Sequence, residues 1–196
     1  MRCFGDGDPL YERYHDEEWG VPVRREQALY ERISLEAFQS GLAWITILRK
    51  REGFRHAFAD FDPEVVAAYG DDDVARLMGD ASIVRNRAKI EAAIANARAV
   101  LALRDAGIDL GELLWSFAPA GPDSHGAAEL RALPAVTPES RAMAKRLKQL
   151  GFRFVGPTTA YASMQAIGIV NDHLAACPCR PGIARLRAAM LAELGR

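Results

Sequence analysis

The sequence predicts an all-α protein, a compact array of many short helices in two packed lobes. Apolar residues recur at the three- and four-residue spacing of amphipathic helices, and helix-start signals precede several of these segments. No stretch alternates apolar and polar residues for long enough to form a half-buried strand. The chain has 196 residues, of which 49% are hydrophobic, so it can fill one domain-sized core and is not disordered.

The first predicted helix is defined by one-turn spacing. Leu29, Ile33 and Ala37 recur along one face, and Gly41 provides a stop. Glu36 falls on the same face, three residues beyond Ile33. A carboxylate on an apolar face is costly unless it is paired or functional, so this residue needs an explanation.

Two further short helices are predicted from acidic residues at their starts. Asp62 and Pro63 favour a helix over 64–68, because aspartate accepts hydrogen bonds from free amides and proline suits the first turn. Asp71 is predicted to cap a helix over 74–78.

The second half of the chain predicts longer helices. One covers about residues 85–104 and ends at Gly107. Its apolar stripe consists of Ile90, Ile94, Ala97 and Leu101. Thr137 and Pro138 start another helix, and residues 152–155 are too short for an independent strand and are predicted as a connection.

The remaining segments are a loop and a tail. Residues 118–136 are predicted to cross between the lobes as a loop, since they contain Pro119, Gly121, Pro122, Gly126 and Pro134. Residues 183–196 are predicted to form a short amphipathic helix. Its apolar residues are Leu186, Met190 and Leu194. We therefore expect a main domain over 1–182 and a C-terminal tail over 183–196.

The absence of targeting signals predicts a cytoplasmic protein, and the uneven distribution of charge allows, but does not require, a surface that binds a polyanion. Residues 1–80 carry 10 basic and 17 acidic residues, whereas residues 81–196 carry 15 basic and 9 acidic ones. A basic second half suits a nucleic-acid-binding face, although surface helices that happen to be rich in arginine would give the same count. No apolar run reaches the 18 residues of a membrane span, the acidic start does not resemble a signal peptide, and three cysteines are too few for a disulfide scaffold.

Soft metal ligands stand at both ends of the chain. Cys3 and His15 lie near the start, and His173 and Cys177 lie four residues apart near the end, on one face of a helical turn. Two thiolates and two imidazoles can hold one Zn²⁺ in a closed structural site that joins the two ends. The alternatives are buried apolar cysteines with hydrogen-bonded histidines, or Cys179 as a competing ligand.

A turn bounded by glycines between two predicted helices is a second candidate functional site. One helix ends at Gly151 and the next begins near Gly156, which is the pattern of a helix–hairpin–helix. Glycines let the backbone approach a phosphate, and the amides at the second helix start favour its negative charge. Lys148 and Arg153 add local positive charge; the alternative is an ordinary helical hairpin with a solvated basic face.

Glu36 can form the third constellation with two aromatic residues. Tyr14 and Trp44 would place ring faces beside its carboxylate, an arrangement that suits a flat ligand that is cationic or carries an amino group. The alternative is a surface ion pair between Glu36 and Arg32 on a helix whose apolar face is wrongly assigned.

Several longer motifs occur together and in a fixed order. They are Asp8-Pro9-Leu10-Tyr11, Tyr14-His15-Asp16-Glu17-Glu18-Trp19-Gly20-Val21-Pro22, Gly41-Leu42-Ala43-Trp44-Ile45-Thr46, Leu114-Trp115-Ser116-Phe117, Gly151-Phe152-Arg153-Phe154-Val155-Gly156, Met164-Gln165-Ala166 and Val170-Asn171-Asp172-His173. In these motifs the chain resembles the DNA-3-methyladenine glycosylase I family, the constitutive bacterial type, over about residues 2–182.

The resemblance implies an all-helical, helix–hairpin–helix DNA glycosylase that hydrolyses the N-glycosidic bond of 3-methyladenine in DNA. It implies one structural Zn²⁺ per chain with the ligands Cys3, His15, His173 and Cys177, and thereby excludes Cys179. It implies a base pocket formed by Glu36, Tyr14 and Trp44. It implies a DNA-penetrating loop at Gly41 and Leu42, in which Leu42 fills the gap that the extruded base leaves.

The sequence departs from the family pattern at two places, near Cys3 at the start of the chain and at Ser163. The family usually has a tryptophan shortly after its first zinc cysteine, whereas Phe4 follows Cys3 here and residues 5–7 shorten the loop. We expect Phe4 to take over as the stacking residue for the base. Ser163 stands where an aromatic residue is common, which concerns packing more than chemistry.

The expected reaction is monofunctional hydrolysis that leaves an abasic site. Residues 156–164 contain no Asp or Glu to activate water, so the substrate must already be a good leaving group, and no lysine is identified in the pocket. The partners are then alkylated double-stranded DNA and free 3-methyladenine as product, with no membrane and no obligate protein partner, for a monomer. Two alternatives are a DNA-binding module without catalysis and a zinc hydrolase, which would need an open coordination position.

Overall fold

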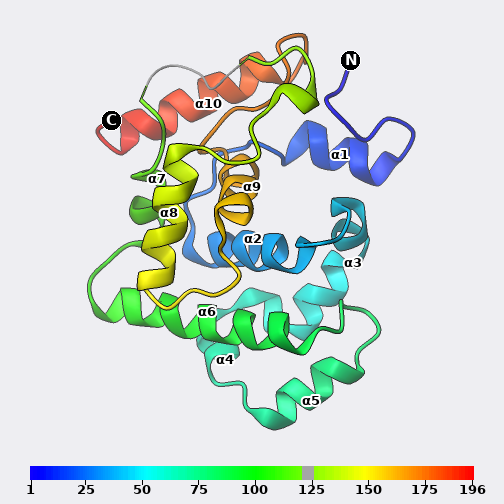
Figure 1. Cartoon of the computed structure of the whole chain (residues 1–196), viewed down its shortest axis with the longest axis vertical. Coiled ribbons are helices and arrows are strands. Elements are labelled where there is room, and N and C mark those ends of the chain that lie inside the picture. The colour runs from blue at the N-terminus through cyan, green and yellow to red at the C-terminus, as the bar shows by residue number, and fades with distance from the viewer. Residues whose placement is uncertain (121–125) are drawn as a thin grey trace.

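The computed structural model describes residues 1–120 and 126–196, and the predicted all-α class is confirmed for them (Figure 1). Its helices are α1 (Pro9–Glu17), α2 (Glu26–Gln39), α3 (Trp44–Ala57), α4 (Pro63–Ala67), α5 (Asp71–Gly79), α6 (Arg87–Asp105), α7 (Leu110–Trp115), α8 (Pro138–Gln149), α9 (Pro157–Ile167) and α10 (Arg180–Glu193), with 3-10 turns η1 (Ala59–Phe61) and η2 (Leu130–Ala132). The described residues contain no strand, and no helix among them is long and apolar enough to cross a membrane.

Most predicted helix starts are correct. The Asp62 side chain accepts the amide of Glu64 at the start of α4, and Thr137 caps α8 through Ser140. Asp71 is not a cap, because α5 begins at that residue and Gly70 occupies the cap position. In place of a capping side chain, the carboxylate of Asp73 accepts the amide hydrogen of Gly70 at 3.1 Å.

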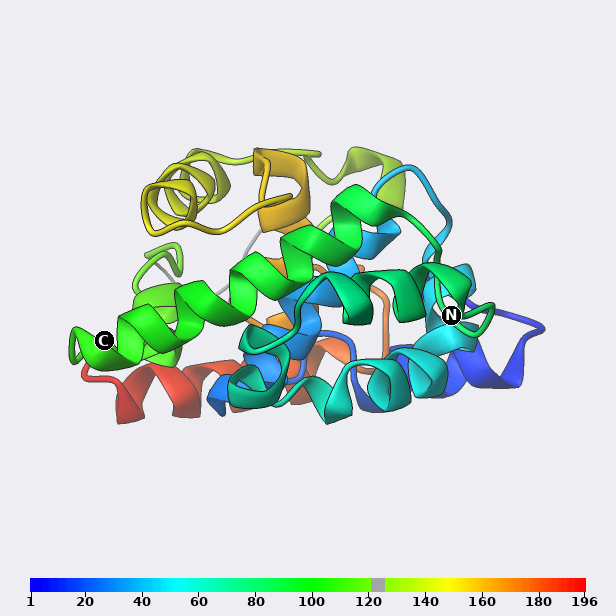
Figure 2. The same cartoon turned by 90° about the horizontal axis from the view of Figure 1, so that it is seen from below.

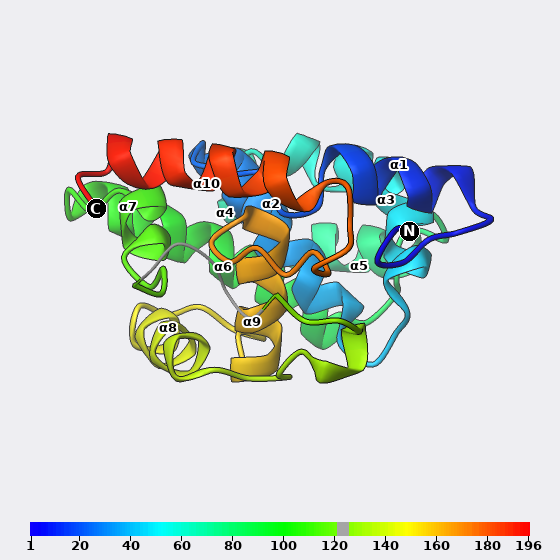
Figure 3. The ribbon, with the colours of Figure 1, turned by 90° about the horizontal axis from the view of Figure 1, so that it is seen from above.

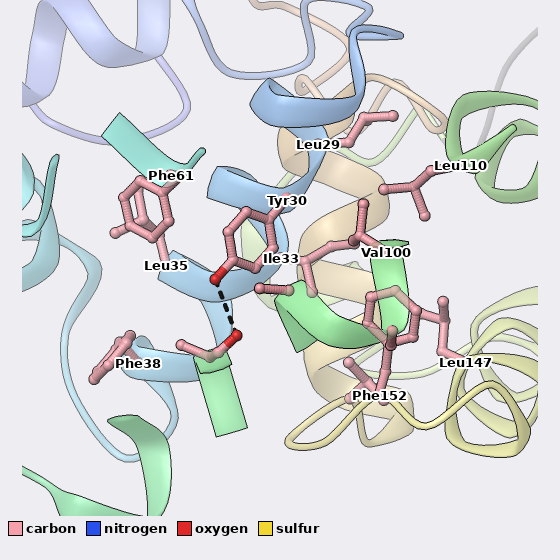
Figure 4. Close-up of a cluster of buried hydrophobic side chains, with 14 of the residues drawn as sticks. Leu29, Tyr30, Ile33, Leu35, Phe38, Phe61, Val100, Leu110, Leu147 and Phe152 are labelled. Atoms are coloured by element: carbon pink, nitrogen blue, oxygen red, sulfur yellow. Dashed lines mark hydrogen bonds between the residues drawn. The ribbon is translucent and has the colours of Figure 1, made fainter. Parts of the chain in front are cut away.

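The main core lies where α2, α6 and α9 meet. Figure 2 shows α6 crossing one face of the molecule, and Figures 1 and 3 show α9 running through its middle. Figure 4 shows α2 side chains, among them Leu29 and Ile33, in the same buried cluster as Val100 of α6. The buried hydroxyl of Tyr30 donates to the carbonyl oxygen of Ala93 at 2.9 Å, which ties α2 to α6. This core fixes the helix that carries Glu36.

A second, smaller cluster of buried residues is formed mainly by the N-terminal arm, α1 and the segment before α10. Figure 3 shows α1 beside the start of α10, so the N-terminal arm lies next to the segment that leads into the last helix. Its buried members are Cys3, Tyr14, Trp19, Leu48, Leu174 and Cys177. The arrangement brings residues more than 160 positions apart into contact.

The C-terminal helix differs in detail from the expected tail. It begins at Arg180, so the expected boundary at residue 182 falls inside α10, and the division into domain and tail stays a prediction. Leu186 is 49% exposed and does not lie on the buried face. Arg187 does: it is 1% exposed, and its Nε donates to the carbonyl oxygen of Ile169 at 2.8 Å. The loop expected over 118–136 contains the turn η2, and its Gly121 and Pro122 lie outside the described residues.

Candidate active site and metal cluster

A cavity of about 310 Å³ lies between α1, α2, α3 and α9. It is lined by Phe4, Tyr11, Tyr14, Trp19, Glu36, Gln39, Trp44, Leu130, Leu133, Pro134, Ala162 and Gln165. The lining is mostly aromatic and apolar, and its one carboxylate comes from α2. All four residues that the sequence assigned to a base pocket line it.

Glu36 is buried, with 5% of the residue exposed. Burial raises the pKa of its carboxyl group to about 8, and the positive charge of Arg32 opposes this only in part. Arg32 lies 3.8 Å from a carboxylate oxygen of Glu18. The alternative of a surface pair between Glu36 and Arg32 is therefore wrong, because the carboxyl group is neither at the surface nor in an ion pair in the described structure.

Aromatic rings form the walls of the cavity. The rings of Tyr14 and Trp44 lie 5.2 Å apart between centroids at an interplanar angle of 41°. Phe4 packs at 4.9 Å from Trp19 and at 6.4 Å from Tyr14. Trp44 is the first residue of α3, and its buried indole N–H has no hydrogen-bond partner among the described residues. A buried donor without an acceptor is energetically costly. The indole N–H of Trp44 is therefore available to donate a hydrogen bond to a ligand in the cavity.

A second cavity, of about 380 Å³, continues from the first. The two share Glu36, Gln39 and Ala162, and the second extends to the turn at Leu42 and to Thr158 at the start of α9. The pocket with the buried carboxyl group therefore opens between this turn and α9.

The turn between α2 and α3 is held in place by hydrogen bonds from Lys89 of α6. Gly41 has a φ of 83°, a left-handed conformation that favours glycine, and Leu42 is 41% exposed. The ammonium group of Lys89 donates to the carbonyl oxygens of Phe38 at 2.9 Å and Ser40 at 2.5 Å. Lys89 thus satisfies carbonyls at the end of α2, and the exposed leucine projects from a fixed turn.

A short turn bounded by glycines joins α8 and α9, at the place where the sequence predicts a helix–hairpin–helix. Gly151 follows the end of α8 with a φ of 91°, and Gly156 precedes α9 as its cap residue. Phe152 is buried as an anchor of the turn. A side chain of α6, Asn96, donates to the carbonyl oxygen of Arg153 at 3.2 Å and accepts its amide at 2.7 Å, which locks the hairpin. Lys148 and Arg153 are exposed on the outer side of this turn.

The four predicted metal ligands meet within the smaller cluster. Their ligand atoms all lie within 4.8 Å of one another, and all four residues are buried. Sγ of Cys177 lies 3.4 Å from Nδ1 of His173 and 3.7 Å from Nε2 of His15, and Sγ of Cys3 lies 3.6 Å from Nδ1 of His173. Ordinary Zn–S and Zn–N bonds at tetrahedral angles separate nitrogen from sulfur by about 3.6 Å. The residues therefore fit a tetrahedral metal ion.

Surrounding groups orient the two imidazoles. Nδ1 of His15 lies 2.8 Å from a carboxylate oxygen of Asp16, and Nε2 of His173 lies 2.9 Å from the carbonyl oxygen of Trp19. Each ring then donates from one nitrogen and turns the other towards the sulfur atoms. Burial lowers the pKa of His173 to about 4, which keeps its imidazole neutral. Cys179 lies outside this set, with its Sγ 3.8 Å from Asp16.

Comparison with known proteins decides the family. The family model for methyladenine glycosylase matches residues 4–180. This chain belongs to the methyladenine glycosylase family. It is 49% identical to DNA-3-methyladenine glycosylase 1 of Escherichia coli (strain K12) over 175 residues, which cover 89% of this chain and 94% of that protein.

Solved structures of methyladenine glycosylases share the fold. A crystal structure of 3-methyladenine DNA glycosylase I is 48% identical with a TM-score of 0.89, covering 92% of this chain and all of that one. The enzyme from Staphylococcus aureus, described for its recognition of 3-methyladenine, is 37% identical with a TM-score of 0.86, covering 91% of this chain and 95% of that one. The resemblance inferred from the sequence motifs is confirmed.

Several lining residues of this glycosylase pocket were not predicted from the sequence. Tyr11 and Gln39 stand one helical turn from Tyr14 and Glu36, so their three-residue spacing was a usable signal. Leu133 comes from the loop after η2 and gave no such signal. Ser163 does not line the cavity; its hydroxyl donates to the carbonyl oxygen of Thr159 within α9, at 3.0 Å.

Proposed function

We propose that this protein is a monofunctional DNA glycosylase that hydrolytically removes 3-methyladenine from alkylated double-stranded DNA and leaves an abasic site. The observation that carries the proposal is the buried carboxyl group of Glu36 in a cavity with aromatic walls. The relatives named for the same base support it. The free base is the expected product, and a monomer with no obligate protein partner is expected.

The substrate base must leave the duplex to reach this cavity. Extrusion costs a few kcal/mol, and an apolar side chain that enters the vacated step offsets part of that cost. Leu42 is suited to this role because it is exposed on a fixed turn at the mouth of the cavity. The amides between Gly151 and Gly156, with Lys148 and Arg153 beside them, would grip the phosphate backbone without regard to sequence.

The reaction needs little chemical assistance from the protein. Methylation at N3 gives adenine a positive charge, which weakens its glycosidic bond. Glu36 would accept a hydrogen bond from the amino edge of the base, and the cationic ring would favour the ionised form of its carboxylate. Tyr14, Trp44 and Phe4 would stack against or enclose the ring, which excludes water from the charge pair.

Cys3, His15, His173 and Cys177 would hold one Zn²⁺ ion per chain. When bound there it would supply structure only, since four protein ligands leave no open position for chemistry. The site would join the arm before α1 to the segment before α10. That connection would fix α1, whose residue Tyr14 forms a wall of the pocket.

The proposal is tested by incubating the protein with methylated duplex DNA and identifying every released base by chromatography. We expect 3-methyladenine to be released and the DNA to remain unbroken until the abasic sites are cleaved chemically. Glu36→Gln should still bind DNA but lose excision, whereas Glu17→Gln, at an exposed position, should keep it. Failure of the unaltered protein to release any methylated base, or a covalent adduct trapped by borohydride, would contradict the proposal.

A further inference from the structure

Gln165, in the wall of the pocket, is held from behind by hydrogen bonds that run through Asp172 to Tyr161. Its Nε2 donates to Oδ2 of Asp172 at 2.8 Å, and the hydroxyl of Tyr161 donates to the same oxygen at 2.5 Å. Asp172 is 3% exposed, and Tyr161 is equally buried. Gln165 itself lines the cavity that contains Glu36.

The chain of hydrogen bonds fixes which end of the amide faces the cavity. A carboxylate has no hydrogen to donate, so it can pair only with the NH₂ end of a glutamine. The carbonyl end of Gln165 is then the end left for a ligand, and it makes no hydrogen bond among the described residues.

The pocket consequently has hydrogen-bond acceptors on two helices. Glu36 comes from α2 and Gln165 from α9, and these helices pack against each other in the core. An adenine-type base carries an amino group at C6, which donates, whereas a guanine-type base carries an oxygen there, which accepts. An acceptor fixed in place favours the first and repels the second.

We propose that Gln165, oriented by Asp172, is a specificity-determining residue that selects a 6-amino purine over a 6-oxo purine. This inference rests on the proposed function and adds to it a reason for discrimination between methylated adenine and methylated guanine. Asp172 acts as a positioning residue, because it contacts Gln165 and does not line the cavity.

The test compares Gln165→Met, which keeps the length of the side chain and removes its acceptor, with the unaltered protein. Two ratios are measured: the affinities for free 3-methyladenine and free 3-methylguanine, from quenching of tryptophan fluorescence, and the release of both bases from methylated DNA. We expect the preference for the adenine base to fall about five- to tenfold, which corresponds to one lost neutral hydrogen bond.

Two further variants separate orientation from packing. Asp172→Asn introduces a side chain that can also donate, so the Gln165 amide can turn over and the preference should fall although Gln165 is unchanged. Tyr161→Phe removes a different hydrogen bond to the same carboxylate but leaves it unable to donate, so the preference should stay as in the unaltered protein. Thermal unfolding of each variant verifies that it is folded.

The outcomes distinguish this inference from the proposed function. Unchanged ratios in a folded Gln165→Met protein would overturn the role of Gln165 while leaving the excision of 3-methyladenine intact. An equal loss of affinity for both bases would overturn it as well, because it would indicate packing without discrimination. Absence of excision by the unaltered protein would contradict the proposed function, and the two free-base affinities would still test Gln165.

Discussion

Glu36 should destabilise the protein at neutral pH, and Glu36→Gln should remove that effect. The pKa of this carboxyl group is about 8 in the folded protein, against an ordinary value of 4.5. Below pH 4.5 the group is protonated in both the folded and the unfolded state, so it has no effect on stability. As the pH rises above 4.5 the unfolded chain loses its proton first, which favours unfolding.

The size of the effect follows from the difference in pKa. The free energy of unfolding should fall by about 1.4 kcal/mol per pH unit between the two pKa values, and the fall should level off above pH 8. At pH 7 this amounts to roughly 3 kcal/mol, a large part of the stability of a typical domain. Glutamine has nearly the same shape and does not ionise, so the variant escapes this loss.

The assay is urea unfolding of both proteins at pH 5, 6, 7 and 8. The stability advantage of Glu36→Gln should grow steadily over this range and be small at pH 5. Protonation of the metal ligands affects both proteins alike and drops out of the difference. Glu17→Gln, which removes an exposed carboxylate, is the matched control. An advantage of constant size at every pH would refute the reasoning, because it would mean that Glu36 is ionised in the folded pocket.

The remaining predictions concern the stacking wall, the metal cluster and the exposed turn. Trp44→Ala should weaken the binding of free 3-methyladenine by about 1–3 kcal/mol in a calorimetric titration, and unchanged affinity would remove Trp44 from the pocket. Cys177→Ser should lower the metal content and the melting temperature more than the excision rate per folded molecule; an unaltered metal content would exclude it as a ligand. Leu42→Ala should slow excision from duplex DNA while changing stability by no more than about 0.5 kcal/mol, because the side chain is exposed. Its affinity for the free base should stay the same, and a parallel loss of both would place Leu42 in the pocket wall.

Local features of the fold could be predicted because short-range chemistry decides them. Asp62 and Thr137 cap their helices from one residue away, and Gly151 and Gly156 bound the hairpin as predicted. Aspartate is favoured both at the cap position and in the first turn of a helix, so the sequence could not decide between these two positions for Asp71. In the structure Asp71 is the first residue of α5.

In the C-terminal helix α10, the spacing of apolar residues did not predict which side chains are buried. Leu186 shares a helical stripe with Met190 and Leu194, yet it is exposed, while Arg187 is buried. The guanidinium group finds carbonyl oxygens at Ile169 and Pro119, and so its burial is tolerated. These acceptors come from distant parts of the chain, and no spacing within α10 indicates them.

The sequence by itself determined the helical class, the glycine-bounded turn, the four candidate metal-binding residues and the carboxylate on an apolar helix face. Each of these depends on residues within a few turns of one another or on residue type alone. Only the tertiary structure decided that Glu36 is buried without an ion pair, that the two cysteines and two histidines come together, and that Asp172 accepts from the amide of Gln165. These properties depend on how helices distant in sequence pack together, because burial, pKa and hydrogen-bond direction belong to the assembled environment and not to the residue.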